Sequence, residues 1–413
     1  MHERFCEGEI ATLRKFGIVI FANRIIYEAQ PPMSKKDIEA VQKYCLGPIP
    51  KPLLDLWSQT AGGRLPYRLS IIMDGNVEPL EWKELFYNGS DSYNDLKGWI
   101  NHERKLTRAA SGFNLLKISS NLRAKLTDLP IGGFDRTDRV YVNVSASPES
   151  GQVQGWSEGN YRRGDAFGTI AEDLYGAFEA LFLEEDSIAE EGRDGGELAA
   201  FLETSVRAGL SRTLADKVLE YYRQAIVDWR TPLQQKTLAQ NPLLANMALR
   251  QSIERDDRDL IFELSNAGVN LHTSIRGASP VEYAFALEKF QALEALIDLR
   301  AAVNKDILYN MISGAVPAPA MRALLQCGAE PTVIAIVQCA SAGEYESARI
   351  LAQACSASPD FEDEFARAKQ RFLENFERSV TEVQAGVLHD FRGEEGLKNC
   401  LLQLKNFELT SSS

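Results

Sequence analysis

A short pattern that recurs through the C-terminal half of the sequence places the strongest limit on its fold. Each copy runs from the apolar end of a helix into a turn, and the copies lie at residues 264–270, 296–304, 324–331 and 351–360. The equivalent turn positions are Gly268, Arg300, Gly328 and Ser356, which lie 32, 28 and 28 residues apart. One such helical unit cannot bury its own apolar face, so we expect stacked neighbours with a cap at each end.

A stretch between the first two copies has the features of a helix start. Residues 279–284 read Ser-Pro-Val-Glu-Tyr-Ala, which resembles the Thr-Pro-Leu-His-x-Ala start of an ankyrin repeat. The recurring turns are similar to the one that ends the second ankyrin helix, although the last two intervals are shorter than the usual period of about 33 residues. The resemblance implies ankyrin-like helical repeats over residues 243–360. A helical connector or cap over 197–242 and a C-terminal helical cap over 361–413 would enclose them.

The N-terminal half mixes strand and helix signals. Residues 18–27 form two β-rich runs around an Ala-Asn-Arg turn and predict a hairpin. Ser34 and Pro50 are favourable starts for two helices, which are expected to bury Trp57 and other apolar residues. Further segments predict strands at 69–73, 139–144 and 151–156, a helix around 96–103, and a last amphipathic helix from Thr169 to Leu183 that buries Phe178. Helices grouped around a few strands indicate an α+β domain.

The order and spacing of these elements resemble the SUKH superfamily, which includes many bacterial immunity proteins. The matching segments are 38–41, 49–57, 61–63, 129–135, 138–144, 151–156 and 170–183. The chain departs from the family in its leading hairpin, in a long stretch between Leu106 and Leu126, and in an Ala-Gly-Gly where the family usually has Asn-Gly-Gly. The resemblance implies an SUKH-like domain over 33–186, in which helices pack a mixed sheet. An N-terminal hairpin extension at 1–32 would precede it, and the polar, glycine-rich segment 187–196 would be a linker.

No constellation in the sequence predicts catalysis. The six cysteines are scattered without a Cys-x-x-Cys pair and the four histidines lie far apart, so a metal site is not expected. The glycine-rich segment 131–136 lacks the spacing of a phosphate-binding loop, and the acidic runs at 184–186 and 256–257 are explained by solvated helix faces or ends. We therefore expect a protein that is not an enzyme, with no catalytic residue, no cofactor and no metal.

The charge of the chain bears on its partners. The formal net charge is −13, and the residues from 186 onward hold 33 acidic against 23 basic side chains. Such a field repels nucleic acid and anionic membranes and favours basic partners, or else contributes to solubility alone. No apolar run approaches the ~20 residues that cross a bilayer, and the acidic N-terminus is unlike a secretory leader. We expect a cytoplasmic protein with neither a nucleic-acid nor a membrane partner.

The resemblances imply a function in protein binding. Several members of the SUKH superfamily are immunity proteins that plug the active sites of toxin enzymes. The chain is therefore expected to neutralise a cognate bacterial toxin of nuclease, deaminase or ADP-ribosyltransferase class, encoded by a neighbouring gene. The alternative is a regulatory adaptor that scaffolds endogenous proteins through the same two modules, and an enzyme of unrecognised type is a third interpretation.

The candidate binding residues lie in one polar loop. Tight occlusion of a partner requires a few aromatic or arginine anchors surrounded by polar residues. The loop after the predicted strand 151–156 offers such a set, which comprises Trp156, Glu158, Tyr161, Arg162, Arg163 and Asp165. The other interpretation of this loop is an ordinary exposed connection. Trp156 itself is also expected to fill the groove between sheet and helices.

Overall fold

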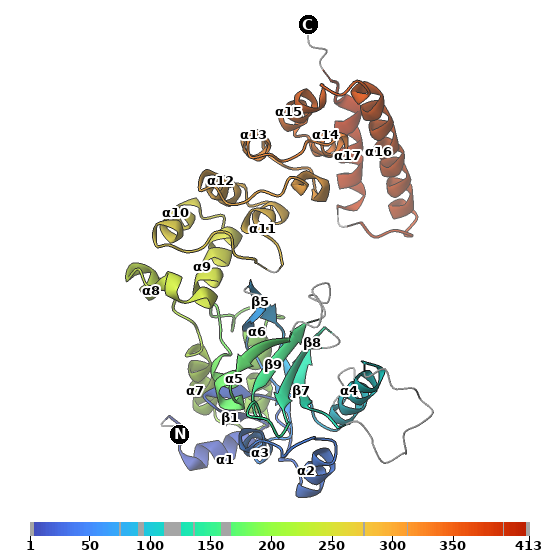
Figure 1. Ribbon diagram of the computed structural model, residues 1–413. Coiled ribbons are helices and arrows are strands. Elements are labelled where there is room, and N and C mark those ends of the chain that lie inside the picture. The colour runs from blue at the N-terminus through green and yellow to red at the C-terminus, as the bar shows by residue number, and fades with distance from the viewer. Residues whose placement is uncertain are drawn as a thin grey trace. The chain divides into compact units, whose positions relative to one another are not determined.

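The chain folds into two compact units, Met1–Asp228 and Trp229–Ser413. The computed structural model (Figure 1) describes residues 4–73, 76–89, 95–110, 125–134, 137–157, 167–275, 277–311, 313–390 and 392–409. Over these residues the first unit combines strands and helices, and the second unit is helical with connecting turns. The predicted α+β region followed by an all-helical region is confirmed.

The first unit is built on a six-stranded sheet. Its strand order is β10-β9-β8-β7-β6-β3. The strands are β3 (Gly63–Arg64), β6 (Glu84–Leu85), β7 (Asp128–Phe134), β8 (Asp138–Asn143), β9 (Val153–Ser157) and β10 (Phe167–Ala171). All described strand pairs in this sheet are antiparallel, so the expectation of a mixed sheet is wrong. Short connections join β7 to β8 to β9, whereas a parallel pair requires a crossover of a dozen residues or more.

Two hairpins accompany this sheet. The first consists of β1 (Val19–Phe21) and β2 (Arg24–Ile26), and the second of β4 (Leu69–Met73) and β5 (Asn76–Leu80). The first hairpin confirms the prediction for residues 18–27. Ala22 and Asn23 form its turn with φ angles of 42° and 61°. Two successive positive φ values are typical of the tight turn whose twist matches that of paired strands.

Seven helices complete the described part of the first unit. They are α1 (Glu7–Lys15), α2 (Lys35–Gln42), α3 (Lys51–Trp57), α4 (Leu96–Ala110), α5 (Leu174–Glu179), α6 (Asp194–Arg207) and α7 (Arg212–Arg223). Ser34 and Pro50 are the N-caps of α2 and α3, at the predicted starts. The helix predicted from Thr169 is wrong in its first part, because Thr169 pairs with β9 in strand β10. Helix α5 begins after Asp173, whose carboxylate accepts a hydrogen bond from the Gly176 N–H group.

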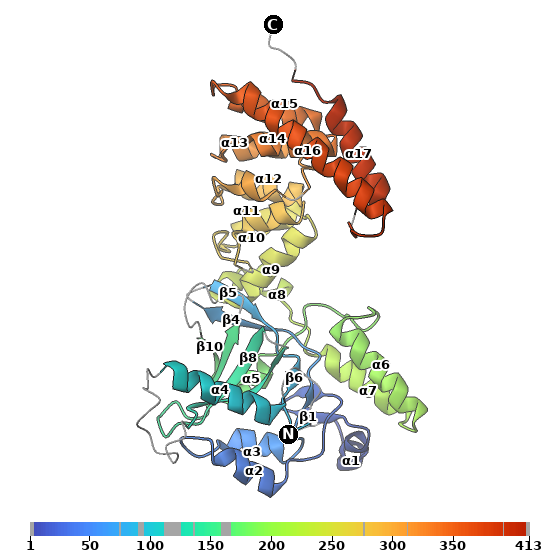
Figure 2. The same ribbon diagram turned by 90° about the vertical axis from the view of Figure 1, so that its right-hand side faces the viewer.

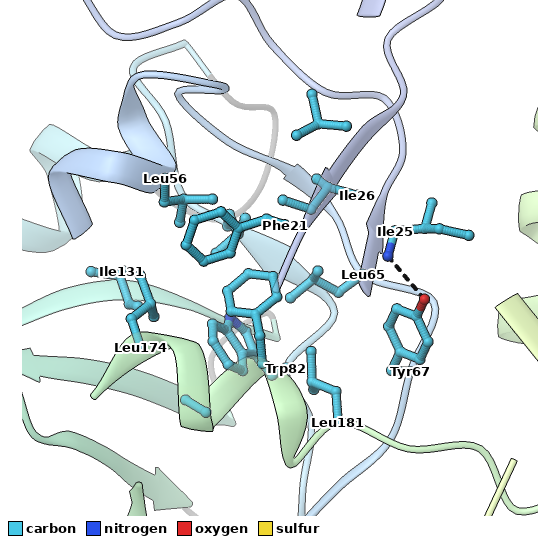
Figure 3. Packing of buried hydrophobic residues seen from close by; sticks show 14 of the residues in the cluster. Phe21, Ile25, Ile26, Leu56, Leu65, Tyr67, Trp82, Ile131, Leu174 and Leu181 are labelled. Carbon is cyan, nitrogen blue, oxygen red and sulfur yellow. Dashed lines mark hydrogen bonds between the residues drawn. The ribbon is translucent and has the colours of Figure 1, made fainter. Parts of the chain in front are cut away.

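The core of the first unit gathers aromatic side chains from segments far apart in the sequence (Figure 3). The Trp82 and Phe178 side chains are completely buried, with ring centroids 5.2 Å apart. Phe21 of the hairpin packs edge-to-face on Phe178 at 4.9 Å. The buried hydroxyl of Tyr67 accepts a hydrogen bond from the Ile25 N–H group at 2.9 Å. Phe178 is buried as predicted, and the hairpin belongs to this core.

The first unit extends further in both directions than the sequence indicates. The predicted hairpin extension at 1–32 is an integral part of it, since Arg24 donates hydrogen bonds to the carbonyl groups of Leu181 and Glu179. Helices α6 and α7, predicted to lie in a separate connector, contribute Leu198 and Tyr222 to the same core. These side chains are completely buried. The unit therefore continues to Asp228 instead of ending near residue 186.

The segment predicted as a linker, 187–196, is tightly packed. Gly195 and Gly196 lie at the start of α6 with ordinary negative φ values. A Cβ atom on Gly195 would lie 2.6 Å from the Ser187 hydroxyl, and one on Gly196 would lie 2.0 Å from the carbonyl oxygen of Glu190. These glycines permit close contact between α6 and the preceding turn. Their presence indicates packing here and not flexibility.

The second unit is a stack of helix pairs closed by two long helices (Figure 2). Its helices, including two 3₁₀ turns labelled η, are α8 (Arg230–Gln234), η2 (Leu238–Gln240), α9 (Pro242–Glu254), α10 (Arg258–Asn266), α11 (Pro280–Ala286), α12 (Phe290–Asp298), η3 (Ile307–Asn310), α13 (Ala318–Gln326), α14 (Val333–Ala342), α15 (Tyr345–Cys355), α16 (Phe361–Gln384) and α17 (Gly393–Asn406). The second helices of successive pairs, α10, α12, α13 and α15, pack in series. Helix α14 also packs against α16 and α17, which cover the last pair.

The recurring sequence pattern ends the second helix of three pairs in the same way. Gly268, Arg300 and Gly328 have φ angles of 83°, 61° and 94°. In each case the next N–H group donates back to a carbonyl five residues earlier, at 3.0, 2.9 and 3.0 Å for the pairs Val269 to Leu264, Ala301 to Leu296 and Ala329 to Leu324. This is the Schellman ending of a helix. Ser356 differs, since its φ is −63°. The third pair is short because the four-residue turn η3 replaces its first helix.

Candidate partner-binding site

The predicted binding loop lies largely outside the described residues. Those positions are Glu158, Tyr161, Arg162, Arg163 and Asp165. Trp156 is described and lies in β9, one residue before the strand ends. It is half-buried. Side chains alternate along β9, so the buried Val153 and Gly155 face the core while Trp156 lies on the opposite face.

The neighbour of Trp156 across the sheet is a buried arginine. Arg139 of β8 is in register with Trp156, so the two side chains share one face of the sheet. The Arg139 side chain is buried, and its guanidinium carbon lies 3.3 Å from the centroid of the Trp99 ring of α4. Its Nη1 donates to the Asp138 carbonyl oxygen at 2.5 Å. A desolvated guanidinium stacked on tryptophan is a strong cation–π contact, and it fixes this arginine.

A second polar contact holds α4 on the same face. The Tyr141 hydroxyl donates to the Glu103 carboxylate at 3.1 Å. Burial raises the pKa of Glu103 above its usual value, while the hydrogen bond from Tyr141 opposes that rise. Burial, reinforced by the charge of Glu103, raises the pKa of Tyr141 as well. Tyr141 therefore remains a donor throughout the physiological range, and the contact helps to position the helix that carries Trp99.

Phe134 is an exposed aromatic residue that the sequence interpretation did not single out. It ends strand β7, and its side chain is 47% exposed. It pairs with Asp138, which in turn pairs with Ser157, so Phe134 lies at the same end of the sheet as Trp156. The available signal was a phenylalanine directly after Gly132-Gly133 and before a polar turn. Since paired residues share a face and successive residues alternate, Phe134 lies on the face of Asp138 and Ser157, opposite to that of Arg139 and Trp156. We define Phe134, Arg139 and Trp156, which lie at this one end of the sheet on its two faces, as the sheet-end cluster.

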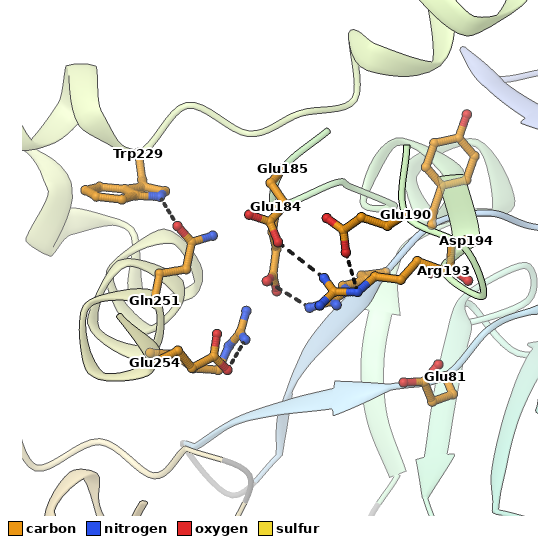
Figure 4. A network of polar contacts seen from close by, with 12 residues as sticks. Glu81, Glu184, Glu185, Glu190, Arg193, Asp194, Trp229, Gln251 and Glu254 are labelled. Carbon is orange, nitrogen blue, oxygen red and sulfur yellow. Dashed lines mark hydrogen bonds and ion pairs between the residues drawn. The ribbon is translucent and has the colours of Figure 1, made fainter. Parts of the chain in front are cut away.

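A separate network of ion pairs surrounds a small pocket in the first unit (Figure 4). The pocket is lined by Arg68, Leu183, Glu184, Glu185, Ser187, Arg193 and Asp194. Arg68 contacts Glu184 at 2.8 Å, and Arg193 contacts Glu190 at 2.7 Å. Lys83 also pairs with Asp194. Each of these cations already has a carboxylate partner, so the network fastens the segment before α6.

The described residues contain neither a metal-binding cluster nor a membrane-spanning helix. Within these ranges, no group of three histidine, cysteine, aspartate or glutamate side chains is arranged to hold a metal ion. The helices in the same ranges include none that is both long and apolar enough to span a bilayer. Comparison with known proteins gives no match to a family model, to a curated protein or to a solved structure.

Proposed function

We propose that this chain is a non-enzymatic immunity protein that binds a cognate bacterial toxin in the producer cytosol and occludes its active site. The observation that carries the proposal is the sheet-end cluster. It lies at the end of the sheet where β9 ends and the polar segment after Trp156 begins. Phe134 is exposed and Trp156 is half-buried beside the immobilised Arg139. Aromatic residues and arginine are typical of the few residues that dominate the energy of a protein interface. The toxin would be of nuclease, deaminase or ADP-ribosyltransferase class and encoded by an adjacent gene.

The finer family assignment is part of the same proposal. An SUKH-like first unit is supported by the two helices that begin at Ser34 and Pro50 and by the strands at the expected segments. Ankyrin-like repeats in the second unit are supported by the stacked helix pairs and by the three equivalent Schellman endings. Both kinds of module act by binding proteins, which agrees with an antidote that works by occlusion.

The second candidate function is a regulatory adaptor that scaffolds endogenous proteins. It is favoured by the presence of two compact units, since a scaffold joins partners through separate modules. Genomic context separates the two functions, because an immunity gene lies directly beside a large toxin gene. Co-expression of the neighbouring gene with and without this chain tests the proposal: protection of the host supports immunity, and unchanged toxicity contradicts it.

Neutralisation of the toxin is expected to be stoichiometric. Occlusion consumes one binding protein per toxin molecule, because no chemical step regenerates it. Titrating the purified chain against a fixed amount of toxin should abolish toxin activity near molar equivalence. If a small molar fraction of this chain inactivated all of the toxin, an enzymatic antidote would replace the occlusion mechanism.

The sheet-end cluster is expected to supply much of the binding energy. Replacing Phe134 and Trp156 together with alanine should weaken toxin affinity at least about a hundredfold, since truncating an interface anchor costs about 2 kcal/mol or more. Calorimetric titration measures the affinity, and a thermal melt checks the fold. Leu46→Ala is the matched control, because Leu46 is an exposed apolar residue (52%) elsewhere in the same unit.

The predicted loop provides an independent arm of the same test. Replacing Tyr161, Arg162 and Arg163 with alanine should also lower the affinity without lowering the melting temperature. If both sets of variants bound as tightly as the unchanged chain, the interface would lie elsewhere. A deletion of residues 240–413 that removed all affinity would then assign it to the helix pairs.

A further inference from the structure

The turns between the two helices of a pair carry a strained acidic residue. Asp256 follows α9 with a φ of 55°, and Glu288 follows α11 with a φ of 57°. Both sit in Schellman endings, in which Asp257 donates to Ser252 and Lys289 donates to Ala284, each at 2.9 Å. Glycine adopts this left-handed conformation without strain, whereas a residue with a Cβ atom does not. An acidic side chain at both positions therefore calls for a compensating contact.

Both acidic side chains contact the next pair in the stack. One carboxylate oxygen of Asp256 accepts a hydrogen bond from the Ala292 N–H group at 2.8 Å. Ala292 is the third residue of α12, and the first N–H groups of a helix have no acceptor within that helix. Asp256 therefore caps the N-terminus of a helix that belongs to the following pair. Glu288 accepts a hydrogen bond from the Ser313 hydroxyl, which in turn accepts one from the Ala315 N–H group at 3.1 Å. Ser313 and Ala315 lie in the connection between η3 and α13.

In the corresponding turn of the last pair the left-handed position is occupied by glycine instead of an acidic residue. Gly343 follows α14 with a φ of 86°, and Glu344 donates to Cys339 in the same Schellman pattern. No further helix pair follows here; α16 and α17 cover the stack, and Gly343 faces Gln403 of α17. The acidic residue is thus present at the turns after α9 and α11, the two full first helices that have a following pair. In the third pair, where η3 replaces the first helix, the left-handed residue before α13 is Gly314, with a φ of 73°. Glycine replaces it where the stack ends.

We propose that Asp256 and Glu288 are inter-pair latches, which hold successive helix pairs of the second unit in a fixed register. At each latch, the hydrogen bond to the next pair offsets the backbone strain of an acidic residue in the left-handed conformation. A surface that spans several pairs is thereby presented as one ordered array. The inference rests on the second unit alone and is independent of the proposed function.

Hydrogen exchange of the full chain tests the latch at Asp256. We expect Asp256→Ala and Asp256→Gly to accelerate exchange at Ala292 and the first turn of α12 about tenfold or more, as for loss of a helix cap. The glycine variant is decisive, because it removes the strain as well as the carboxylate. Asp256→Asn should stay close to the unchanged chain, since asparagine retains an acceptor oxygen and tolerates the left-handed region.

Asp257→Ala is the matched control. Asp257 caps its own helix by accepting from the Leu260 N–H group at 3.0 Å, so its loss should accelerate exchange in α10 rather than at Ala292. Glu288→Gly should act one pair later, at Ala315 and the start of α13. Unchanged or slower exchange at Ala292 in the glycine variant, with the control behaving as described, would overturn the latch. If the alanine variant failed to fold, the asparagine and glycine variants would still distinguish the two outcomes.

Discussion

A chain cut after Asp186 is expected not to fold, whereas a chain of residues 1–228 should fold by itself. The cut removes α6 and α7, and with them the completely buried side chains of Leu198, Val218 and Tyr222. Burying each such side chain contributes about 1.5–3 kcal/mol, and a whole domain is stable by only about 5–15 kcal/mol. The cut also removes the hydrogen bond from the Tyr222 hydroxyl to the Pro66 carbonyl oxygen, which measures 2.7 Å.

Near-ultraviolet circular dichroism and a thermal melt of the two truncated chains provide the measurement. The chain of residues 1–228 should show fixed aromatic signals and one cooperative transition. The chain of residues 1–186 should show neither, and should expose apolar surface that binds a hydrophobic dye. A sharp transition of equal midpoint in both chains would mean that the domain does end near residue 186 and that α6 and α7 are dispensable.

Removing a central aromatic side chain should destabilise the first unit nearly as severely. We expect Phe178→Ala and Trp82→Ala each to lower the free energy of unfolding by about 3–5 kcal/mol, the range for large-to-small changes in a packed core. Phe178 is central because it contacts Phe21 of the hairpin and Trp82 at the same time. Its loss would leave a cavity where three segments meet.

Urea denaturation, followed through the transition of the first unit, measures these changes. Tyr175→Phe is the control: Tyr175 lies in the same helix as Phe178 but is 37% exposed, and its hydroxyl bonds to Asp55 at the surface. It should change stability by less than about 1 kcal/mol, as is usual for surface positions. Equal effects of Phe178→Ala and Tyr175→Phe would show that Phe178 is not at the centre of the core.

Local signals in the sequence predicted features that depend on a few adjacent residues. The 18–27 hairpin follows from two β-rich runs around a tight turn. The start of α2 follows from Ser34, whose hydroxyl accepts from the Asp37 N–H group. The recurring turn pattern at Gly268 and its equivalents specifies a helix ending that requires no distant contact. Each of these is set by backbone conformation and by hydrogen bonds within about six residues.

The candidate site was predictable in part. The sequence pointed to Trp156 through its place at the end of a strand before a polar loop, and to the aromatic and arginine content of that loop. It did not indicate that Arg139 would lie beside Trp156, because that depends on the register between β8 and β9. Nor did it indicate Phe134, whose exposure depends on β7 ending at the same end of the sheet as Trp156.

The extent of the first unit and the composition of its core were decided by the tertiary structure. Gly195 and Gly196 look like a flexible linker in the sequence, yet they are required where α6 approaches Ser187 and Glu190 too closely for a side chain. Thr169 stands at the predicted start of a helix, before apolar residues at helical spacing, yet pairing with β9 makes it part of a strand. The spacing of apolar residues in the sequence indicates which residues are buried. The partner against which they are buried is set by contacts between distant segments, and those contacts exist only once the chain has folded.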